Sequence, residues 1–432
     1  MPTLSDKLKS LGVKVGPADL PTPLPVQPAS LDQVLGGAAY LTPQGETYRV
    51  EARYPADHPH GSAHLHIHAP LHGLALWGRD NHIAELPPQS FAFLDTETTG
   101  LSGGSGTYAF LIGIGRFEGE EFHLAQFFMR DPLEEPAQLA AFEEFLAPCQ
   151  AMVTFNGKTF DIPLLYTRFV THGWQPPFTG LAHLDLLHLA RRLWRDRISN
   201  RSLSNLEWQI LGALRTEEDV PGWEIPELYF DYLKDGDPSP LKRVFYHNAM
   251  DVVSLAALMN HMAALLANPL QAELEHGVDL IDLAKLFEDL GDLDTATRLY
   301  IHGLEHEDAH AELLPKALFL DAIQRLAQIH KRQQDFPAAI ELWQQAARHR
   351  HLEAHLELAK FYEHHQKDYP EAIYWTQTAI ALVEDPQALA DLPRLLTPYE
   401  RRQWLAELTH RLERLQNKQH GHEPGSNQGP QA

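Results

Sequence analysis

Two carboxylates one residue apart follow four apolar residues in "FAFLDTETTG", residues 91–100. If residues 91–97 form a buried strand, Asp95 and Glu97 point to the same face, about 6–7 Å apart at a rise of ~3.3 Å per residue. Two acids this close repel each other, so they stay charged only if a cation or a hydrogen-bond donor lies between them, and otherwise one must protonate. The pattern therefore indicates a cation site or a strongly shifted acid.

Two further acids can complete this pair. The stretch "VTFNGKTFDIPLL" puts Asp161 just beyond a predicted strand, at the start of a helix and five residues after Asn156. The stretch "VFYHNAMDVVSL" puts Asp251 on a predicted helix. His247 lies four residues before Asp251 and shares its helix face, whereas Tyr246 is turned by about 100° from His247.

Four carboxylates and one titratable ring from several elements are the groups that a two-metal phosphodiesterase requires. In such a site two divalent ions about 4 Å apart bridge the attacking and leaving oxygens, and carboxylates hold both ions. Oxygen ligands favour Mg²⁺ or Mn²⁺ over zinc. The ring would orient the nucleophilic water or remove its proton.

The elements that must position these groups are strands followed by alternating strands and helices. Three successive strands, a helix, a buried strand and a second helix are predicted at residues 89–97, 107–117, 121–129, 136–149, 151–156 and 159–173. This order indicates a three-layer α/β sheet. The glycines of "GLSGGSGTY", residues 100–108, fit neither a P-loop nor a dinucleotide fingerprint, and we interpret them as a flexible connection.

Length and composition place the chain among ordinary globular proteins. Its 432 residues favour two or three domains, and 44% hydrophobic with 22% charged residues is unexceptional. The single cysteine, Cys149, excludes an intramolecular disulfide and fits a reducing cytoplasm. The first residues lack the apolar segment of a secretory signal, and no later run approaches the ~18 apolar residues of a membrane span. We therefore expect a cytoplasmic protein without a membrane partner.

A net charge of -23 argues against nonspecific attraction to nucleic acid, although a local basic patch could still bind it. The strongest candidate is "ARRLWRDRISNR", residues 190–201, with five arginines and one tryptophan. Arginines beside an aromatic ring suit a single strand, and a solvated helix face is the alternative. The candidate substrate contacts here are Arg191, Arg192 and Arg195. Asp185, just upstream, could cap a helix, or it could hold the metal ligands in place without contacting the metal itself.

Three histidines alternate in "HLHIHA", residues 64–69. As a strand this segment would place His64, His66 and His68 on one face, where they could bind a metal. Inward-facing Leu65 and Ile67 explain the alternation equally well, and we favour that interpretation.

The C-terminal part has helical periodicity and an internal repeat. Three segments share a small residue in a first helix, an aspartate at the turn and an alanine in a second helix: Ala284, Ala327 and Ala359; Asp292, Asp335 and Asp368; Ala296, Ala339 and Ala372. The turns lie 43 and 33 residues apart, and the second spacing is close to a period of about 34 residues. This part resembles tetratricopeptide repeats, with Tyr300 and Trp343 at the large position.

The motifs "DTETTG", "NGKTFD" and "YHNAMD" together resemble those of the DEDD (DnaQ-like) superfamily, ribonuclease-H-like nucleases that include the proofreading subunit of bacterial DNA polymerase III. The wider context is similar to the YprB-like branch over roughly residues 30–390, in the stretches "TYAFLIGIG", "HLDLLHLARRLW", "SLSNLEWQILG" and "DVPGWEIPELY". The resemblance implies a mixed sheet flanked by helices, then an all-α repeat domain. It also implies a 3′-to-5′ exonuclease on single-stranded DNA or RNA, with two Mg²⁺ or Mn²⁺ ions held by Asp95, Glu97, Asp161 and Asp251.

Within these motifs, Thr98 and Asn156 are further candidate substrate contacts, although Asn156 could instead fix the turn before Asp161. The third motif departs from the family pattern, which has a His five residues before the last Asp or a Tyr four before it. Here Tyr246 stands at minus five and His247 at minus four. We favour His247 as the general base, and Tyr246 or a metal-activated water remains open.

These inferences predict an N-terminal extension with a linker and short strands, an exonuclease domain, helical repeats and a disordered tail, at residues 1–85, 86–265, 272–415 and 416–432. The second hypothesis for the function is an interaction protein. In it the repeats bind a protein partner and the nuclease fold is a degenerate platform, because stacked repeats form concave binding surfaces.

Overall fold

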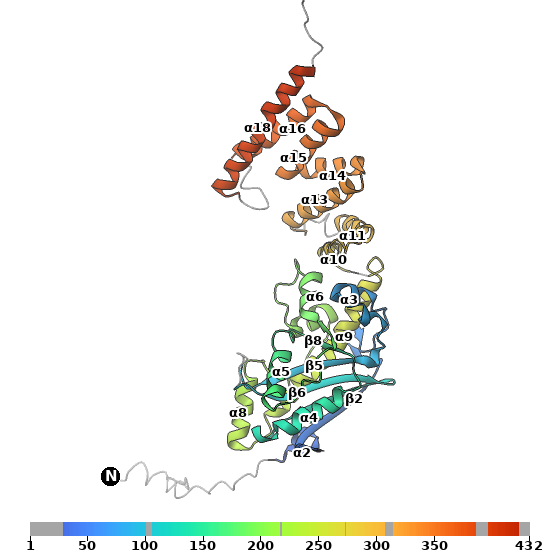
Figure 1. Ribbon diagram of the computed structural model, residues 1–432, viewed down its shortest axis with the longest axis vertical. Helices are drawn as coiled ribbons and strands as arrows, with labels where there is room; N and C mark the ends of the chain where they lie inside the picture. Colours follow the sequence, from blue (N-terminus) through green and yellow to red (C-terminus); the bar gives the residue numbers. More distant parts are fainter. Residues whose placement is uncertain are drawn as a thin grey trace, which may run out of the picture. The chain divides into compact units, whose positions relative to one another are not determined.

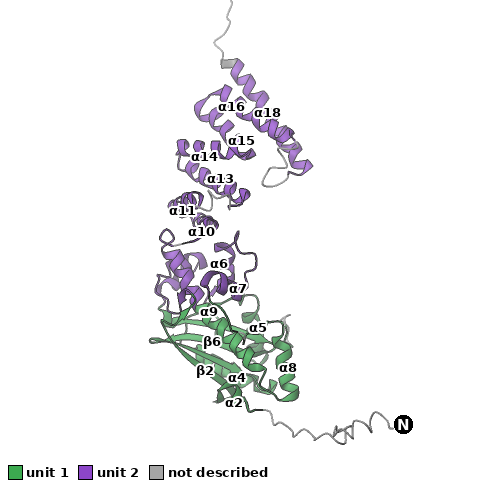
Figure 2. Cartoon of the chain, turned by 180° about the vertical axis from the view of Figure 1, so that it is seen from behind, with its two compact units in different colours: residues 1–61, 87–181, 213–256 green, residues 62–86, 182–212, 257–432 purple. Residues whose placement is uncertain are grey.

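The computed structural model describes residues 29–100, 106–216, 218–272, 274–306, 314–385 and 396–422. The chain forms two compact units (Figure 2), of which unit 1 comprises residues 1–61, 87–181 and 213–256, and unit 2 comprises residues 62–86, 182–212 and 257–432. The predicted N-terminal linker, most of the glycine-rich connection and the end of the predicted tail lie outside the described residues.

A mixed sheet of seven strands in the order β1-β2-β7-β6-β5-β8-β9 forms the centre of the α/β region (Figure 1). Its strands are β1 (Ala38–Thr42), β2 (Gly45–Pro55), β5 (Phe91–Thr98), β6 (Ala109–Glu118), β7 (Glu121–Phe128), β8 (Ala151–Thr154) and β9 (Ala182–Asp185). β5 pairs with β6 antiparallel and with β8 parallel, and β6 pairs with β7 antiparallel. The three successive strands and the buried fourth strand of the sequence analysis are confirmed.

The N-terminal boundary predicted at residue 86 needs correction. β2 pairs antiparallel with β7 over eight residue pairs, from Tyr48 opposite Phe128 to Pro55 opposite Glu121. Tyr48 is buried, so this strand contributes to the same core as β7. Residues 62–86, with β4 (Ala63–His64) and α3 (His72–Gly78), instead group with unit 2.

Helices cover both faces of the sheet in unit 1. Ala92 and Leu94 of β5 belong to one buried cluster with residues of α4 (Glu135–Leu146) and α5 (Asp161–Thr171). Phe110 and Phe128 belong to a second cluster with residues of α8 (Ile225–Asp235) and α9 (Leu241–Ala267). The predicted three-layer arrangement is therefore confirmed, and alternation along β5 puts Phe91, Phe93, Asp95 and Glu97 on the side opposite to Ala92 and Leu94.

Two glycines of β6 give α9 the room to approach the sheet. A Cβ atom on Gly113 would lie 2.1 Å from Oδ1 of Asn248, and one on Gly115 would lie 2.9 Å from Cγ1 of Val252. Both contacts are closer than a side chain tolerates, so the glycines fix how near α9 can lie. This close approach places the middle of α9 against β5 and β6.

α9 is also the one helix in the described residues that is long and apolar enough to cross a membrane, judged by length and composition alone. Its most apolar window is 72% buried inside the fold, as is typical of a core helix.

Helical hairpins follow α9. They are built from α10 (Gly277–Leu290), α11 (Leu293–Glu305), α13 (Lys316–Arg332), α14 (Phe336–Arg348), α15 (Leu352–Phe361), η6 (Tyr362–Gln366) and α16 (Tyr369–Glu384). The predicted turn residues Asp292, Asp335 and Asp368 each cap the second helix of a hairpin with a side-chain oxygen. The predicted alanines are all fully buried between helices. The repeated hairpins are thus confirmed, and the tetratricopeptide class stays a prediction.

The disordered tail predicted from residue 416 begins too early. α18 (Pro398–His422) runs through residues 416–422 as a helix. Lys418 explains the extension, because its ammonium pairs with Glu363 at 2.9 Å and so holds this turn against its neighbour.

Candidate active site

Asp95 and Glu97 stand where β5 leaves the core. The four residues before them are buried, and both acids are half-buried. Burial raises the pKa of each carboxyl well above its usual value, and the charges of Asp251 and Asp161 raise it further. The four predicted carboxylates therefore lie close enough to interact, and the charges of Asp161 and Asp251 make Asp95 and Glu97 harder to ionise.

Asp161 reaches this cluster from the first turn of α5. Asn156 holds the preceding turn with a positive φ of 67°, and its carbonyl accepts hydrogen bonds from the backbone N–H groups of Thr159 and Phe160. The hydroxyl of Thr96 donates to Oδ1 of Asp161. Asn156 thus shapes the turn, which was one of its two predicted roles, and Thr96 is a contact that the sequence analysis missed.

Asp251 and His247 share one face of α9, as their spacing predicts. Nε2 of His247 lies 3.5 Å from Oδ2 of Asp251. Nδ1 of His247 lies 2.7 Å from Oδ1 of Asp219, which follows the loop after η5 (Glu207–Leu211). Burial lowers the pKa of His247, but the hydrogen bond to Asp219 and the charge of Asp251 outweigh it and raise that pKa above its ordinary value.

Arg215 brings a positive charge into the cluster. Its guanidinium pairs with Oδ1 of Asp251 and lies 3.7 Å from Oδ2 of Asp219. The Arg215 side chain is only 8% exposed. Neither Arg215 nor Asp219 was predicted, although Asp219 opens "DVPGWEIPELY", a stretch similar to the YprB-like branch.

Asn248 ties the end of β5 to α9. Its amide nitrogen donates to Oδ2 of Asp95 at 2.8 Å, and its Oδ1 accepts from Gln126 at 2.9 Å. Both Asn248 and Gln126 are buried, so the amide pair is satisfied inside the core. Sequence signals for this contact existed in the position of Asn248 within the third motif and in Gly113.

Tyr246 and Thr98 are engaged in backbone contacts. The hydroxyl of Tyr246 accepts from the backbone N–H of Thr216 at 3.0 Å, so it anchors the segment that carries Arg215. The hydroxyl of Thr98 donates to the carbonyl of Gly100 at 3.0 Å, in the turn that ends β5. These contacts give both residues a positioning role, and their predicted catalytic and substrate roles stay predictions.

The cluster has the chemistry of a divalent-metal site, although its side chains are not yet gathered around one point. In the described part of the chain, no three carboxylate, imidazole or thiol groups are placed to hold a single ion. Three of the acids are instead held by Asn248, Thr96 and Arg215. Four mutually repelling carboxylates with hard oxygen donors fit Mg²⁺ or Mn²⁺, since a cation would relieve their repulsion.

The basic segment of residues 190–201 belongs to unit 2, and part of it is used for packing within that unit. Arg192 pairs with Asp289, and Arg197 pairs with buried Asp279 at 2.7 Å. Arg191 and Arg195 are exposed. The predicted patch is thus smaller than its composition suggests, because acids on α10 neutralise two of its charges.

Asp185 is fully buried, and its Oδ1 accepts from the backbone N–H of Leu187 at 3.2 Å. It caps α6 (Leu186–Leu193), which was the simpler of its two predicted explanations.

The three alternating histidines also have the structural explanation. Leu65 and Ile67 are buried, and the rings of His66 and His68 lie 4.5 Å apart between centroids. The predicted strand is shorter than expected, because β4 ends at His64.

Comparison with known proteins identifies the domain in which these residues lie. The model of the RNase H superfamily matches residues 92–263, a range that contains all four acids and His247. The YprB protein of Bacillus subtilis (strain 168), which is described as uncharacterized, is 32% identical over 346 residues. The match covers 77% of this chain and 79% of YprB.

The structure of the family B DNA polymerase from the hyperthermophilic archaeon Pyrobaculum calidifontis is a distant match. It is 16% identical with a TM-score of 0.32, over 56% of this chain and 30% of the polymerase chain, which is too weak to support an assignment. On the strength of the bacterial relative, the chain belongs to the YprB family and carries an RNase H superfamily domain at residues 92–263.

Proposed function

We propose that the protein is a metal-dependent nuclease, a 3′-to-5′ exonuclease that hydrolyses phosphodiester bonds of single-stranded DNA or RNA. The observation that carries the proposal is the cluster of Asp95, Glu97, Asp161 and Asp251, with Nε2 of His247 directed at Asp251. In this cluster Asp161 and Asp251 raise the pKa of Asp95 and Glu97. Two divalent ions, when bound by these acids, supply Lewis-acid chemistry at the scissile phosphate.

His247 is the general base in this proposal. Asp219 accepts the hydrogen of Nδ1, which leaves the lone pair of Nε2 on the side of the acidic cluster. A ring held in this tautomer can take a proton from the attacking water.

The test is a time course of purified protein on end-labelled single-stranded DNA and on RNA of matched sequence. Mn²⁺, Mg²⁺ and a chelator are compared, beside the Asp95→Asn variant. Shortening of the strand from its 3′ end, abolished by chelator and in the variant, is the expected result. Full activity of Asp95→Asn would exclude the proposed cluster as the catalytic centre.

Two observations favour the alternative, a partner-binding protein with a degenerate nuclease domain. Arg215 occupies Asp251, and the carboxylates do not converge on one point as they are placed. The same time course separates the two functions, because a degenerate domain cleaves neither strand with any metal. A single stoichiometric protein partner in a pull-down, together with no cleavage, is the result expected for this alternative.

A further inference from the structure

Arg215 is placed as a cation is placed in an acidic site. Its guanidinium contacts Asp251, lies 3.7 Å from Asp219, and lies 3.5 Å from Nδ1 of His247. The side chains of Arg215, Asp251 and His247 are 8%, 15% and 16% exposed, so water screens these charges only partly. An arginine cannot release its proton, so this charge is permanent.

The charge of Arg215 acts on more than its direct partner. It opposes the rise in the pKa of Glu97 that burial, Asp251 and Asp161 produce. Two neighbouring cations point elsewhere, since Lys242 pairs with exposed Glu218 and Arg243 donates to the backbone carbonyl of Asp219. Among these three cations, Arg215 is therefore the one that directly contacts a predicted metal ligand.

A guanidinium and a divalent ion compete for one carboxylate oxygen. Both carry positive charge, and at about 4 Å two such charges repel by several kcal/mol at the effective dielectric of a protein. A metal that takes Oδ1 of Asp251 must therefore displace Arg215 from it. The displaced guanidinium stays close by, because the hydroxyl of Tyr246 holds the next residue, Thr216.

We propose that Arg215 is an exchangeable counter-ion of the acidic cluster: it occupies Asp251 until a divalent cation takes that carboxylate, and it then binds the phosphate of the substrate. The phosphate role rests on the proposed nuclease function, whereas the exchange at Asp251 does not. A guanidinium offers five N–H donors in a planar fork that matches phosphate oxygens. The same residue thus balances charge in the free protein and contacts substrate in the loaded one.

The first test is calorimetric titration of Mn²⁺ into the full chain without nucleic acid. Arg215→Gln removes the competitor, so Mn²⁺ should bind about tenfold more tightly or better, in line with the one or more pKa units that a single close charge moves. Arg215→Lys keeps a positive charge without the fork and should bind Mn²⁺ with intermediate affinity. Arg243→Gln removes the same charge nearby without touching a carboxylate of the cluster, and should change the affinity less than about twofold.

Equal or weaker Mn²⁺ binding by Arg215→Gln overturns the exchange, provided its circular dichroism matches the wild type. If that variant does not fold, Arg215→Lys decides, since an affinity equal to that of the wild type overturns the exchange as well. The second titration uses a 5′-mononucleotide at saturating Mn²⁺. Arg215→Gln should bind it about tenfold more weakly, the effect of removing a charged hydrogen bond, and unchanged affinity overturns the phosphate role.

The titrations and the cleavage time course together distinguish failure of the proposed counter-ion exchange from failure of the proposed nuclease function. Tighter Mn²⁺ binding by Arg215→Gln, with no cleavage of either strand by the wild type, keeps the exchange and removes the nuclease. Metal-dependent cleavage by the wild type, with the same Mn²⁺ affinity in both proteins, removes the exchange and keeps the nuclease. No Mn²⁺ binding by any of the proteins overturns both.

Discussion

Glu363 in the helical region is fully buried and Asp95 at the end of β5 is half-buried, and the neighbours of these two acids carry opposite charges. The Glu363 carboxylate is fully buried and pairs with Arg411, Arg414 and Lys418 of α18 at 2.6, 2.8 and 2.9 Å. Burial raises the pKa of Glu363, but the hydrogen bonds from Lys418 and Arg414 outweigh it and hold that pKa below its usual value. Asp95 instead has three acids around it, and its pKa is raised.

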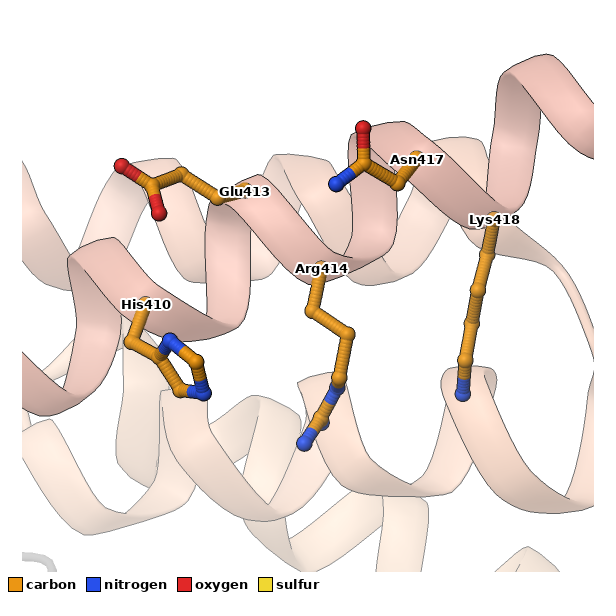
Figure 3. A pocket seen from close by; sticks show the side chains of 5 residues that line it. All are labelled: His410, Glu413, Arg414, Asn417 and Lys418. Carbon is orange, nitrogen blue, oxygen red and sulfur yellow. The ribbon is translucent and has the colours of Figure 1, made fainter.

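Figure 3 shows two of these cations, Arg414 and Lys418, on α18. The side chains of Arg414 and Lys418 extend from one side of the helix, whereas those of Glu413 and Asn417 point in another direction. These residues and His410 line a pocket of about 420 Å³. Two of its cations are already paired with Glu363, so we regard the pocket as part of a packing contact.

The contrast shows what each region is built for. A buried carboxylate with its own cations contributes to stability, or at least is costly to disturb, since removing one partner leaves charges unpaired. Several carboxylates brought together without enough cations cost stability, and such sites occur where function requires them. Arg215 is a partial compensation in unit 1, one guanidinium for four acids. The two regions should therefore respond in opposite ways when a carboxylate is neutralised.

The largest expected effect is on activity, in Glu97→Gln. Neutralising this proposed metal ligand should lower the rate of strand cleavage by the proposed nuclease about 10³-fold, because several kcal/mol of charge stabilisation disappear. The free energy of unfolding without metal should stay equal or rise, since one repelling charge is removed. Cleavage assays and urea unfolding, both at neutral pH, measure the two quantities. A clear loss of stability would mean that the cluster is structural.

Glu363→Gln should do the reverse. Three cations would lose their carboxylate, so the free energy of unfolding should fall by about 2–3 kcal/mol, below the range for fully buried pairs because two of the cations are about 40% exposed. Cleavage per folded molecule should not change. Glu413→Gln on the same helix is the matched control and should alter stability by less than about 0.5 kcal/mol. A free energy of unfolding equal to that of the wild type would show that the three cations do not stabilise the protein through Glu363.

The same residue predicts a pH dependence. The pKa of Glu363 is depressed in the folded protein, so its contribution is complete above the unfolded value of about 4.5. That contribution disappears as pH falls below this value toward the depressed folded pKa. The stability difference between wild type and Glu363→Gln should therefore shrink as the pH is lowered from about 6 to 3. Denaturant unfolding at several pH values measures it, and a constant difference would exclude the charge as the cause.

Gly113→Ala tests the packing that brings α9 to the acidic cluster. The added methyl group would lie 2.1 Å from Oδ1 of Asn248, so Asn248 must leave Asp95 or α9 must move outward. We expect stability to fall by about 1–3 kcal/mol, together with reduced activity. Gly119→Ala, in the turn after β6, meets no atom within 4 Å, so it should lose stability only through its φ of +62° and should keep its activity. Full activity in Gly113→Ala would mean that Asn248 does not position Asp95.

Local periodicity sets the limit of what the sequence could predict. The strand before Asp95 and the helix spacing of His247 and Asp251 follow from local periodicity, and the structure has both. Arg215 and Asp219 reach the cluster from a loop, where no periodicity constrains the side chains, so their contacts could not be inferred. The number of arginines available to bind substrate in residues 190–201 was also overestimated. The acidic partners of Arg192 and Arg197 lie more than eighty residues away on α10, so the sequence did not reveal them.

The smallest expected effect concerns the two arginines of that segment that remain exposed. Replacing both Arg191 and Arg195 by Gln should leave stability within about 0.5 kcal/mol, because neither is buried. If the segment binds single strands, binding should weaken and the slope of log affinity against log salt should fall by about 1.4, roughly 0.7 for each phosphate that is no longer neutralised. Fluorescence anisotropy with a labelled oligonucleotide in chelator measures this slope. Arg197→Gln is the contrasting variant, since it should lower stability without changing the slope, and an unchanged slope in the double variant would leave the exposed arginines as an ordinary solvated surface.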